Sequence, residues 1–114
     1  MNKLYSNIGP THIQYYENGS INKEVYYNNG NLHRDSTIGP AVIKYYENRS
    51  IQSETYYENG KRHRNIGPAY IEYNENGLQK HEVYYKNGII HRHCLFIFNY
   101  ELCYKAQRKR CALI

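Results

Sequence analysis

The chain repeats one pattern three times, and this internal repeat limits the folds open to it more than any other feature. Each copy opens with Ile-Gly-Pro and closes with His-Arg, and paired tyrosines, a glutamate and Asn-Gly dipeptides lie between them. The Ile-Gly-Pro triplets begin at Ile8, Ile38 and Ile66, which gives spacings of 30 and 28 residues. Periods in this range are typical of proteins that stack small units, each packed on its neighbours.

Asn-Gly dipeptides, or a variant of them, divide each copy into short β-prone segments. A type I′ turn needs positive φ at two successive residues, so Asn-Gly between such segments is a strong signal for a β-hairpin. Arg49 stands where the other copies have Gly19 and Gly77. A bulky residue is strained at positive φ, so we expect the turn there to be looser or of another type. The predicted structural turn residues are Asn18, Gly19, Asn29, Gly30, Asn59, Gly60, Asn76, Gly77, Asn87 and Gly88.

These segments predict an all-β fold, an elongated single-layer antiparallel β-meander of about three 28–30-residue repeats with three strands each. The β-repeat domain covers residues 1–92, as a partial repeat at 1–6 and full repeats at 7–36, 37–64 and 65–92. The partial repeat is expected to pair onto the first hairpin as a terminal strand. Residues 93–114 form a short divergent tail, in which 93–98 predict a capping strand over an open sheet edge. From Asn99 onward we expect helix or disorder.

Two-residue turns would assign each side chain to one face of the sheet, because side chains alternate along a strand. One face is nearly constant among the copies and in the first carries Ile13, Tyr15, Glu24, Tyr26 and His33. The other face varies and in the first copy carries Tyr16, Ile21, Val25, Tyr27 and Leu32. We interpret the constant face as structural and the variable face as open to solvent or a partner. The candidate partner surface comprises Tyr16, Tyr27, Tyr46, Tyr57, Tyr85, Arg34, Arg64 and Arg92.

The charge of +5 is not spread along the chain. Residues 1–92 hold eleven Lys or Arg and nine Asp or Glu, whereas residues 93–114 hold four and one. Single-stranded nucleic acid needs clustered cations beside stacking rings, and the near-neutral repeats argue against it despite their 15 tyrosines. We instead interpret the tyrosines as cross-strand pairs that hold the sheet together.

The histidines do not predict a metal site. His33, His63 and His91 would lie about 14 Å apart from copy to copy in a three-strand repeat, too far to share zinc. We interpret them as structural, packing on tyrosines or hydrogen-bonding the glutamates Glu24, Glu54 and Glu82 across strands. A second group, His91, His93, Cys94 and Cys103, has metal-capable residue types but matches no strong zinc spacing.

No catalytic or cofactor-binding residue is predicted either. The chain lacks a Gly-rich phosphate loop, a Ser/His/Asp set and a Cys-His nucleophile order. Its glutamates alternate with lysines on strand positions, a pattern typical of cross-strand charge pairing. We therefore expect a non-catalytic scaffold or protein-interaction module, with an unidentified protein partner and end-to-end self-association through open sheet edges.

The C-terminal tail indicates an alternative function, membrane association. It ends in a basic run followed by Cys111-Ala112-Leu113-Ile114, which has the form of a C-a-a-X box. A prenylated Cys111 beside those cations would supply two membrane-anchoring signals. The candidate lipidation site is therefore Cys111, and the protein would then be membrane-peripheral. Without a signal peptide or a long apolar run at residues 1–7, the expected location is intracellular and cytoplasmic.

Several segments resemble the MORN-repeat variant family. Tyr-Tyr-Glu-Asn-Gly at 15–19 and 56–60, Tyr-Tyr-Lys-Asn-Gly at 84–88 and His-Arg-Asn-Ile-Gly-Pro-Ala at 63–69 are similar to arrays encoded by giant DNA viruses of amoebae. The resemblance covers residues 2–92 and implies an antiparallel β-meander with a scaffold or binding role, and host cytoplasm if the protein is viral. It implies no enzymatic activity, cofactor or defined site. The chain has no tryptophan, so the family's lipid link does not carry over.

Overall fold

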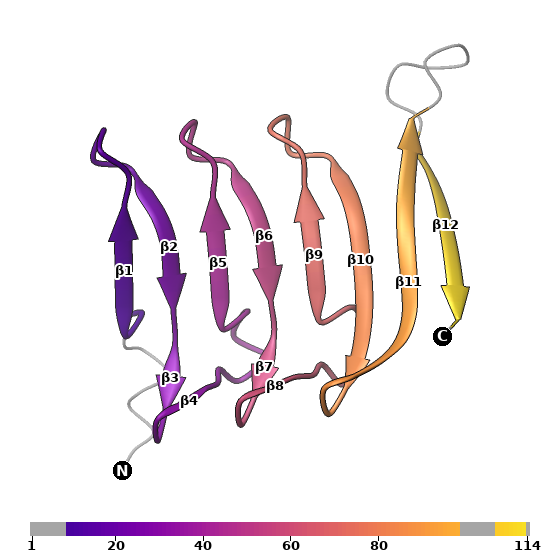
Figure 1. The fold of residues 1–114 in the computed structure, drawn as a ribbon, viewed down its shortest axis with the longest axis horizontal. Coiled ribbons are helices and arrows are strands. Elements are labelled where there is room, and N and C mark those ends of the chain that lie inside the picture. Colours follow the sequence, from indigo (N-terminus) through magenta and orange to yellow (C-terminus); the bar gives the residue numbers. More distant parts are fainter. Residues whose placement is uncertain (1–8, 99–106, 114) are drawn as a thin grey trace.

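The structure is a computed structural model that describes residues 9–98 and 107–113. Within these residues it is all-β, without a helix. Figure 1 shows the strands side by side in one layer, and the molecule measures 54 × 38 × 19 Å. The strands are β1 (His12–Tyr15), β2 (Ile21–Val25), β3 (Tyr27–Asn28), β4 (Asn31–Leu32), β5 (Val42–Tyr45), β6 (Ile51–Thr55), β7 (Tyr57–Glu58), β8 (Lys61–Arg62), β9 (Tyr70–Tyr73), β10 (Gln79–Lys86), β11 (Ile89–Phe98) and β12 (Gln107–Leu113).

Eight strands form one antiparallel sheet in the order β1-β2-β5-β6-β9-β10-β11-β12. β3–β4 and β7–β8 are separate two-stranded ribbons below the sheet in Figure 1. This differs from the predicted three strands per copy in one continuous sheet. The third predicted segment leaves the sheet, because β2 and β6 pair directly with β5 and β9 and leave no position between them.

The chain returns from ribbon to sheet at a corner built by an arginine and the following Gly-Pro. The Arg34 guanidinium lies 3.8 Å from the centre of the Tyr26 ring, and its Nη1 donates to the Pro40 carbonyl oxygen at 3.2 Å. A Cβ on Gly39 would lie 2.7 Å from the same Nη1, so only glycine permits this approach. Arg64, Tyr56 and Pro68 repeat the arrangement with distances of 3.9 and 3.0 Å.

The predicted turns are present, but they are of two kinds. Asn29-Gly30, Asn59-Gly60 and Asn87-Gly88 have positive φ at both residues, as a type I′ turn requires. In the other turns only the second residue has positive φ, namely Gly19, Arg49 and Gly77. There Tyr16 accepts a hydrogen bond from the Gly19 N–H at 3.0 Å and donates to Ser20 at 2.8 Å. These loops are therefore one residue longer than the predicted two-residue turn.

The longer loop corrects two expectations. Tyr15 pairs with Ile21 after a register shift in β1–β2, so Ile21 lies on the same face as Ile13 and not on the variable face. The turn at Arg49 was expected to be looser than those at Gly19 and Gly77 or of another type, but Arg49 has φ 78° and its N–H donates to the Tyr46 carbonyl at 2.9 Å, as that of Gly19 does to Tyr16. The surrounding hairpin imposes the glycine conformation on the arginine.

Strand pairing carries one row of side chains across the whole sheet. Isoleucines alternate with glutamates, and the row ends in two cysteines. We call the side that bears this row the Ile/Glu face, and its members are Ile13, Glu24, Ile43, Glu54, Ile71, Glu82, Cys94 and Cys111. Ile43, Ile71 and Cys94 belong to the core, with Val25 and Val83 from the opposite face.

The C-terminal end departs from the expected tail. Residues 93–98, predicted to cap the sheet, are the second half of β11, and β12 lies beyond them. The expectation of helix or disorder from Asn99 onward is wrong for Gln107–Leu113, which pair with β11 along their whole length. The predicted terminal strand before Asn7, and residues 99–106, lie outside the described residues.

Candidate binding groove

A groove of about 450 Å³ lies on the face opposite the Ile/Glu face. Four strands of the sheet, β2, β5, β6 and β9, form its floor, and the two ribbons contribute residues of its wall. Its lining consists of Lys23, Val25, Tyr27, Leu32, Val42, Lys44, Ser53, Thr55, Tyr57, Arg62 and Tyr70. The groove thus joins three cationic side chains to three tyrosines.

Hydrogen bonds between the two ribbons make the wall continuous. The Gly60 N–H donates to the Leu32 carbonyl at 2.8 Å, and the Asn59 N–H donates to His33 Nδ1 at 3.1 Å. The next turn repeats both bonds, from Gly88 to Arg62 at 2.8 Å and from Asn87 to His63 at 2.9 Å. A type I′ turn therefore docks onto the ribbon before it.

These bonds replace the hydrogen bonds to glutamates, one of the two structural contacts expected of the histidines. His33 and His63 bind turn backbones, and no described bond joins them to Glu24 or Glu54. Tyrosine hydroxyls from the neighbouring strand take that place: Tyr45 donates to Glu24 at 2.6 Å and Tyr73 to Glu54 at 2.7 Å.

The groove has an uncompensated positive charge. Lys23 lies directly opposite Lys44 on neighbouring strands, an arrangement that is destabilising for like charges. No carboxylate belongs to the lining, and neither lysine takes part in the ion pairs of the described residues. An anion in the groove would remove this repulsion.

Arg62 is held in position without a carboxylate partner in the lining. Its Nη1 donates to the Tyr85 hydroxyl at 2.9 Å and its Nε to the Tyr57 hydroxyl at 3.4 Å. The guanidinium also lies 5.5 Å from the centre of the Tyr70 ring. Burial opposes the charged form of Arg62, but the two hydroxyl oxygens outweigh burial and the pKa is raised. The guanidinium is therefore a fixed charge.

The structure separates the residues of the predicted partner surface. Tyr27 and Tyr57 line the groove, whereas Tyr85 is outside the lining and accepts a hydrogen bond from Arg62. Tyr16 and Tyr46 instead donate their hydroxyls to the Tyr45 and Tyr73 carbonyls, at 2.6 and 2.7 Å. The three arginines stack on tyrosine rings: Arg34 on Tyr26, Arg64 on Tyr56 and Arg92 on Tyr84.

Sequence reasoning missed Lys23, Lys44 and Tyr70 as part of this surface. Their signal was available in the strand alternation, since Lys23 is two residues from Val25 on the variable face. The groove itself depends on how the ribbons dock, which the alternation does not describe.

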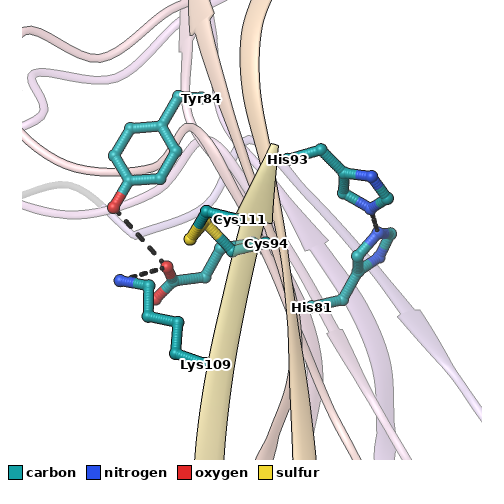
Figure 2. The surroundings of a disulfide bond; sticks show 7 residues. His81, Tyr84, His93, Cys94, Lys109 and Cys111 are labelled. Atoms are coloured by element: carbon teal, nitrogen blue, oxygen red, sulfur yellow. Dashed lines mark hydrogen bonds and ion pairs between the residues drawn. A yellow bond between two sulfur atoms is a disulfide. The ribbon is translucent and has the colours of Figure 1, made fainter. Parts of the chain in front are cut away.

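Cys111, the candidate lipidation site, forms a disulfide with Cys94 across β11 and β12 (Figure 2). A sulfur in a disulfide has no thiol for prenylation, so the two modifications exclude each other. Disulfides persist mainly in oxidising compartments, so the intracellular location stays a prediction. No described segment is a helix that is long and apolar enough to cross a membrane.

Comparisons of the chain with protein-family models, curated proteins and solved structures gave no match. The groove and its charges are therefore the features from which a function can be inferred.

Proposed function

We propose that this protein is a non-catalytic β-repeat interaction module that binds an extended acidic segment of a partner protein in the groove. The observation that carries the proposal is the cluster of Lys23, Lys44 and Arg62 on one surface whose lining contains no carboxylate. Tyr27 and Tyr57 add flat, amphipathic contact area of the kind that is enriched at protein interfaces.

The proposal includes the repeat organisation and the likeness to MORN-repeat variants. It is supported by contacts that recur along the chain: the arginine corner, the ribbon docking and the tyrosine–glutamate bond each occur twice in equivalent positions. Each copy that ends in a Gly-Pro corner would contribute one hairpin to the sheet and one ribbon to the wall, so that the groove grows with the number of such copies.

The test uses a fluorescein-labelled peptide of alternating Glu and Tyr, and a labelled oligothymidine of similar charge. Fluorescence anisotropy at 50 and 200 mM salt measures both affinities. The proposal expects the peptide to bind more tightly, and Arg62→Gln and Lys44→Gln each to weaken it about tenfold, the value of one charge-assisted hydrogen bond. Lys61→Gln is the control, because Lys61 is exposed and outside the lining.

Two outcomes would overturn the proposal. Preferential binding of oligothymidine, lost with Arg62→Gln, would assign the groove to single-stranded nucleic acid. No binding of the peptide at low salt, or equal losses from Arg62→Gln and Lys61→Gln, would show that the groove is not a binding site for acidic segments.

A further inference from the structure

We propose that His81 and His93 form a binding site for a divalent transition-metal ion, with Glu72 as the residue that orients His81. The site is independent of the proposed function, because it needs no partner protein. It does not coincide with the Cys94–Cys111 disulfide. Figure 2 shows the two histidines on one side of the strands and the disulfide on the other.

The two histidines converge from neighbouring strands. In the β10–β11 pair, His81 lies opposite Leu95 and His93 lies opposite Val83, so the histidines are diagonal neighbours on one face. Their rings meet at 71° with centres 4.4 Å apart, and the Nε2 atoms face each other in contact. Both nitrogens that can ligate a metal therefore point to the same place.

Glu72 fixes which nitrogen of His81 is available. It is paired with His81 on the adjacent strand β9, and its Oε1 lies 3.2 Å from His81 Nδ1. A carboxylate on Nδ1 selects the tautomer whose Nε2 carries a free lone pair, which is the arrangement behind many metal-binding histidines. Lys80 Nζ lies 3.5 Å from the other oxygen of Glu72 and helps to hold the carboxylate.

The surroundings allow a metal ion to enter. About a quarter of each side chain of His81 and Glu72 is exposed, so water can fill the remaining coordination positions. A metal bound to two imidazoles at about 2.0 Å each requires the rings to separate slightly, and partly exposed side chains can rotate to do so. Among the described residues no group of three or more His, Cys, Asp or Glu is placed to hold a metal ion together, so the chain would supply the two imidazoles alone as ligands.

Two imidazole ligands define the preference of the site. Imidazole favours Cu²⁺, Ni²⁺ and Zn²⁺, and Cu²⁺ should bind more tightly than Zn²⁺. Mg²⁺ and Ca²⁺, which take oxygen ligands, should not bind. The competing explanation is a plain hydrogen bond from His93 to His81 without metal affinity.

The experiment titrates Cu²⁺, Zn²⁺ and Mg²⁺ into the oxidised full chain and measures heat and the histidine ring signals in NMR spectra. A Cys103→Ser background removes the remaining thiol as a ligand. His81→Gln and His93→Gln should each lower the affinity for Zn²⁺ and Cu²⁺ by more than tenfold, and Glu72→Gln by about tenfold, the lower end for an orienting residue. His12→Gln, an exposed histidine on the distant strand β1, should change nothing.

Selective shifts of the His81 and His93 ring signals on addition of Zn²⁺ would support the site. The proposal is overturned if Zn²⁺ shifts all histidines alike, or if His12→Gln lowers the affinity as much as His93→Gln. It is also overturned if neither Zn²⁺ nor Cu²⁺ binds to the chain with both histidines intact while circular dichroism shows that this chain is folded. The hydrogen bond alone would then explain the contact.

Discussion

The glutamates of the Ile/Glu face receive their hydrogen bonds differently in the first two hairpins, β1–β2 and β5–β6, and at the C-terminal end of the sheet. Glu24 and Glu54 each accept a hydrogen bond from a tyrosine on the next strand, Tyr45 and Tyr73. Glu82 instead pairs with Lys109 of β12, whose Nζ lies 3.0 Å from Glu82 Oε1, and the Tyr84 hydroxyl donates to the same oxygen at 3.5 Å (Figure 2). Each glutamate of the row needs a hydrogen-bond donor, and different residues supply it.

The register explains the difference. Tyr45 and Tyr73 lie two residues after the isoleucine that faces the glutamate. In the last hairpin Cys94 faces Glu82, and the residue two positions later is Phe96, which has no hydroxyl. Lys109 lies opposite Phe96 on β12 and supplies a charged donor at 3.0 Å, shorter than the 3.5 Å bond from Tyr84. Burial of Glu82, with 6% exposed, makes that donor necessary.

The chain path differs for a related reason. After His33-Arg34 and His63-Arg64 the Gly-Pro corner returns the chain to the sheet, whereas no such corner follows His91-Arg92. β11 therefore runs on beside β10, and both strands are long. The Gly-Pro corner, together with its arginine, therefore separates ribbon from sheet.

The largest expected effect comes from removing the disulfide, which only the C-terminal end possesses. Cys94→Ser with Cys111→Ser should destabilise β12 by about 3 kcal/mol, because the disulfide joins residues 17 positions apart and so restricts the unfolded chain. Hydrogen exchange should show lost protection in β12 and unchanged protection in β5–β6. Cys103→Ser is the control. Equal protection of β12 with and without the bond would contradict the prediction.

Lys109→Met should cost about 2 kcal/mol, because it leaves the buried Glu82 carboxylate without its charged donor. Adding Phe96→Tyr to Lys109→Met should recover much of this loss, because it restores the tyrosine hydroxyl that donates to Glu24 and Glu54 elsewhere in the row. Urea unfolding of the two single variants and the double variant measures the coupling. Additive effects would show that Phe96 does not occupy the equivalent position.

Arg49→Gly should stabilise the protein by about 1 kcal/mol, because Arg49 adopts a positive φ that glycine adopts without strain. The matched change, Gly19→Arg, should destabilise by a similar amount at the equivalent turn. Thermal unfolding of both variants gives the comparison. A loss of stability in Arg49→Gly would mean that the arginine side chain outweighs the strain.

The smallest effect concerns alkaline pH. Burial and the bond to a glutamate raise the pKa of Tyr45 and Tyr73. An unfolded tyrosine titrates near 10, so this contribution to stability is complete below about pH 10 and falls as the pH rises above it. Tyr45→Phe with Tyr73→Phe should reduce the drop in the urea midpoint between pH 8 and pH 11.

Tyr15→Phe with Tyr27→Phe is the control for the alkaline experiment, because these tyrosines are 62% and 47% exposed. An identical drop in the Tyr45 and Tyr73 variant would contradict the prediction.

Sequence reasoning predicted the all-β class, the turn positions and most face assignments, because Asn-Gly and strand alternation act over a few residues. It placed Val25, Tyr27 and Leu32 on one face, and all three line the groove. It failed where one extra loop residue changes the strand register: the loop at Gly19 moved Ile21 to the other face. It also could not find the pair His81 and His93, whose approach depends on the diagonal register of β10 and β11.

The amino-acid sequence by itself determined where the backbone reverses at the Asn-Gly dipeptides, since glycine and asparagine adopt positive φ most readily, whereas the turn at Arg49 depends on its hairpin. The tertiary structure decided which segments stay in the sheet, which donor reaches each glutamate and which cations share a groove. These outcomes follow from contacts between residues far apart in the chain, and a local pattern does not contain them.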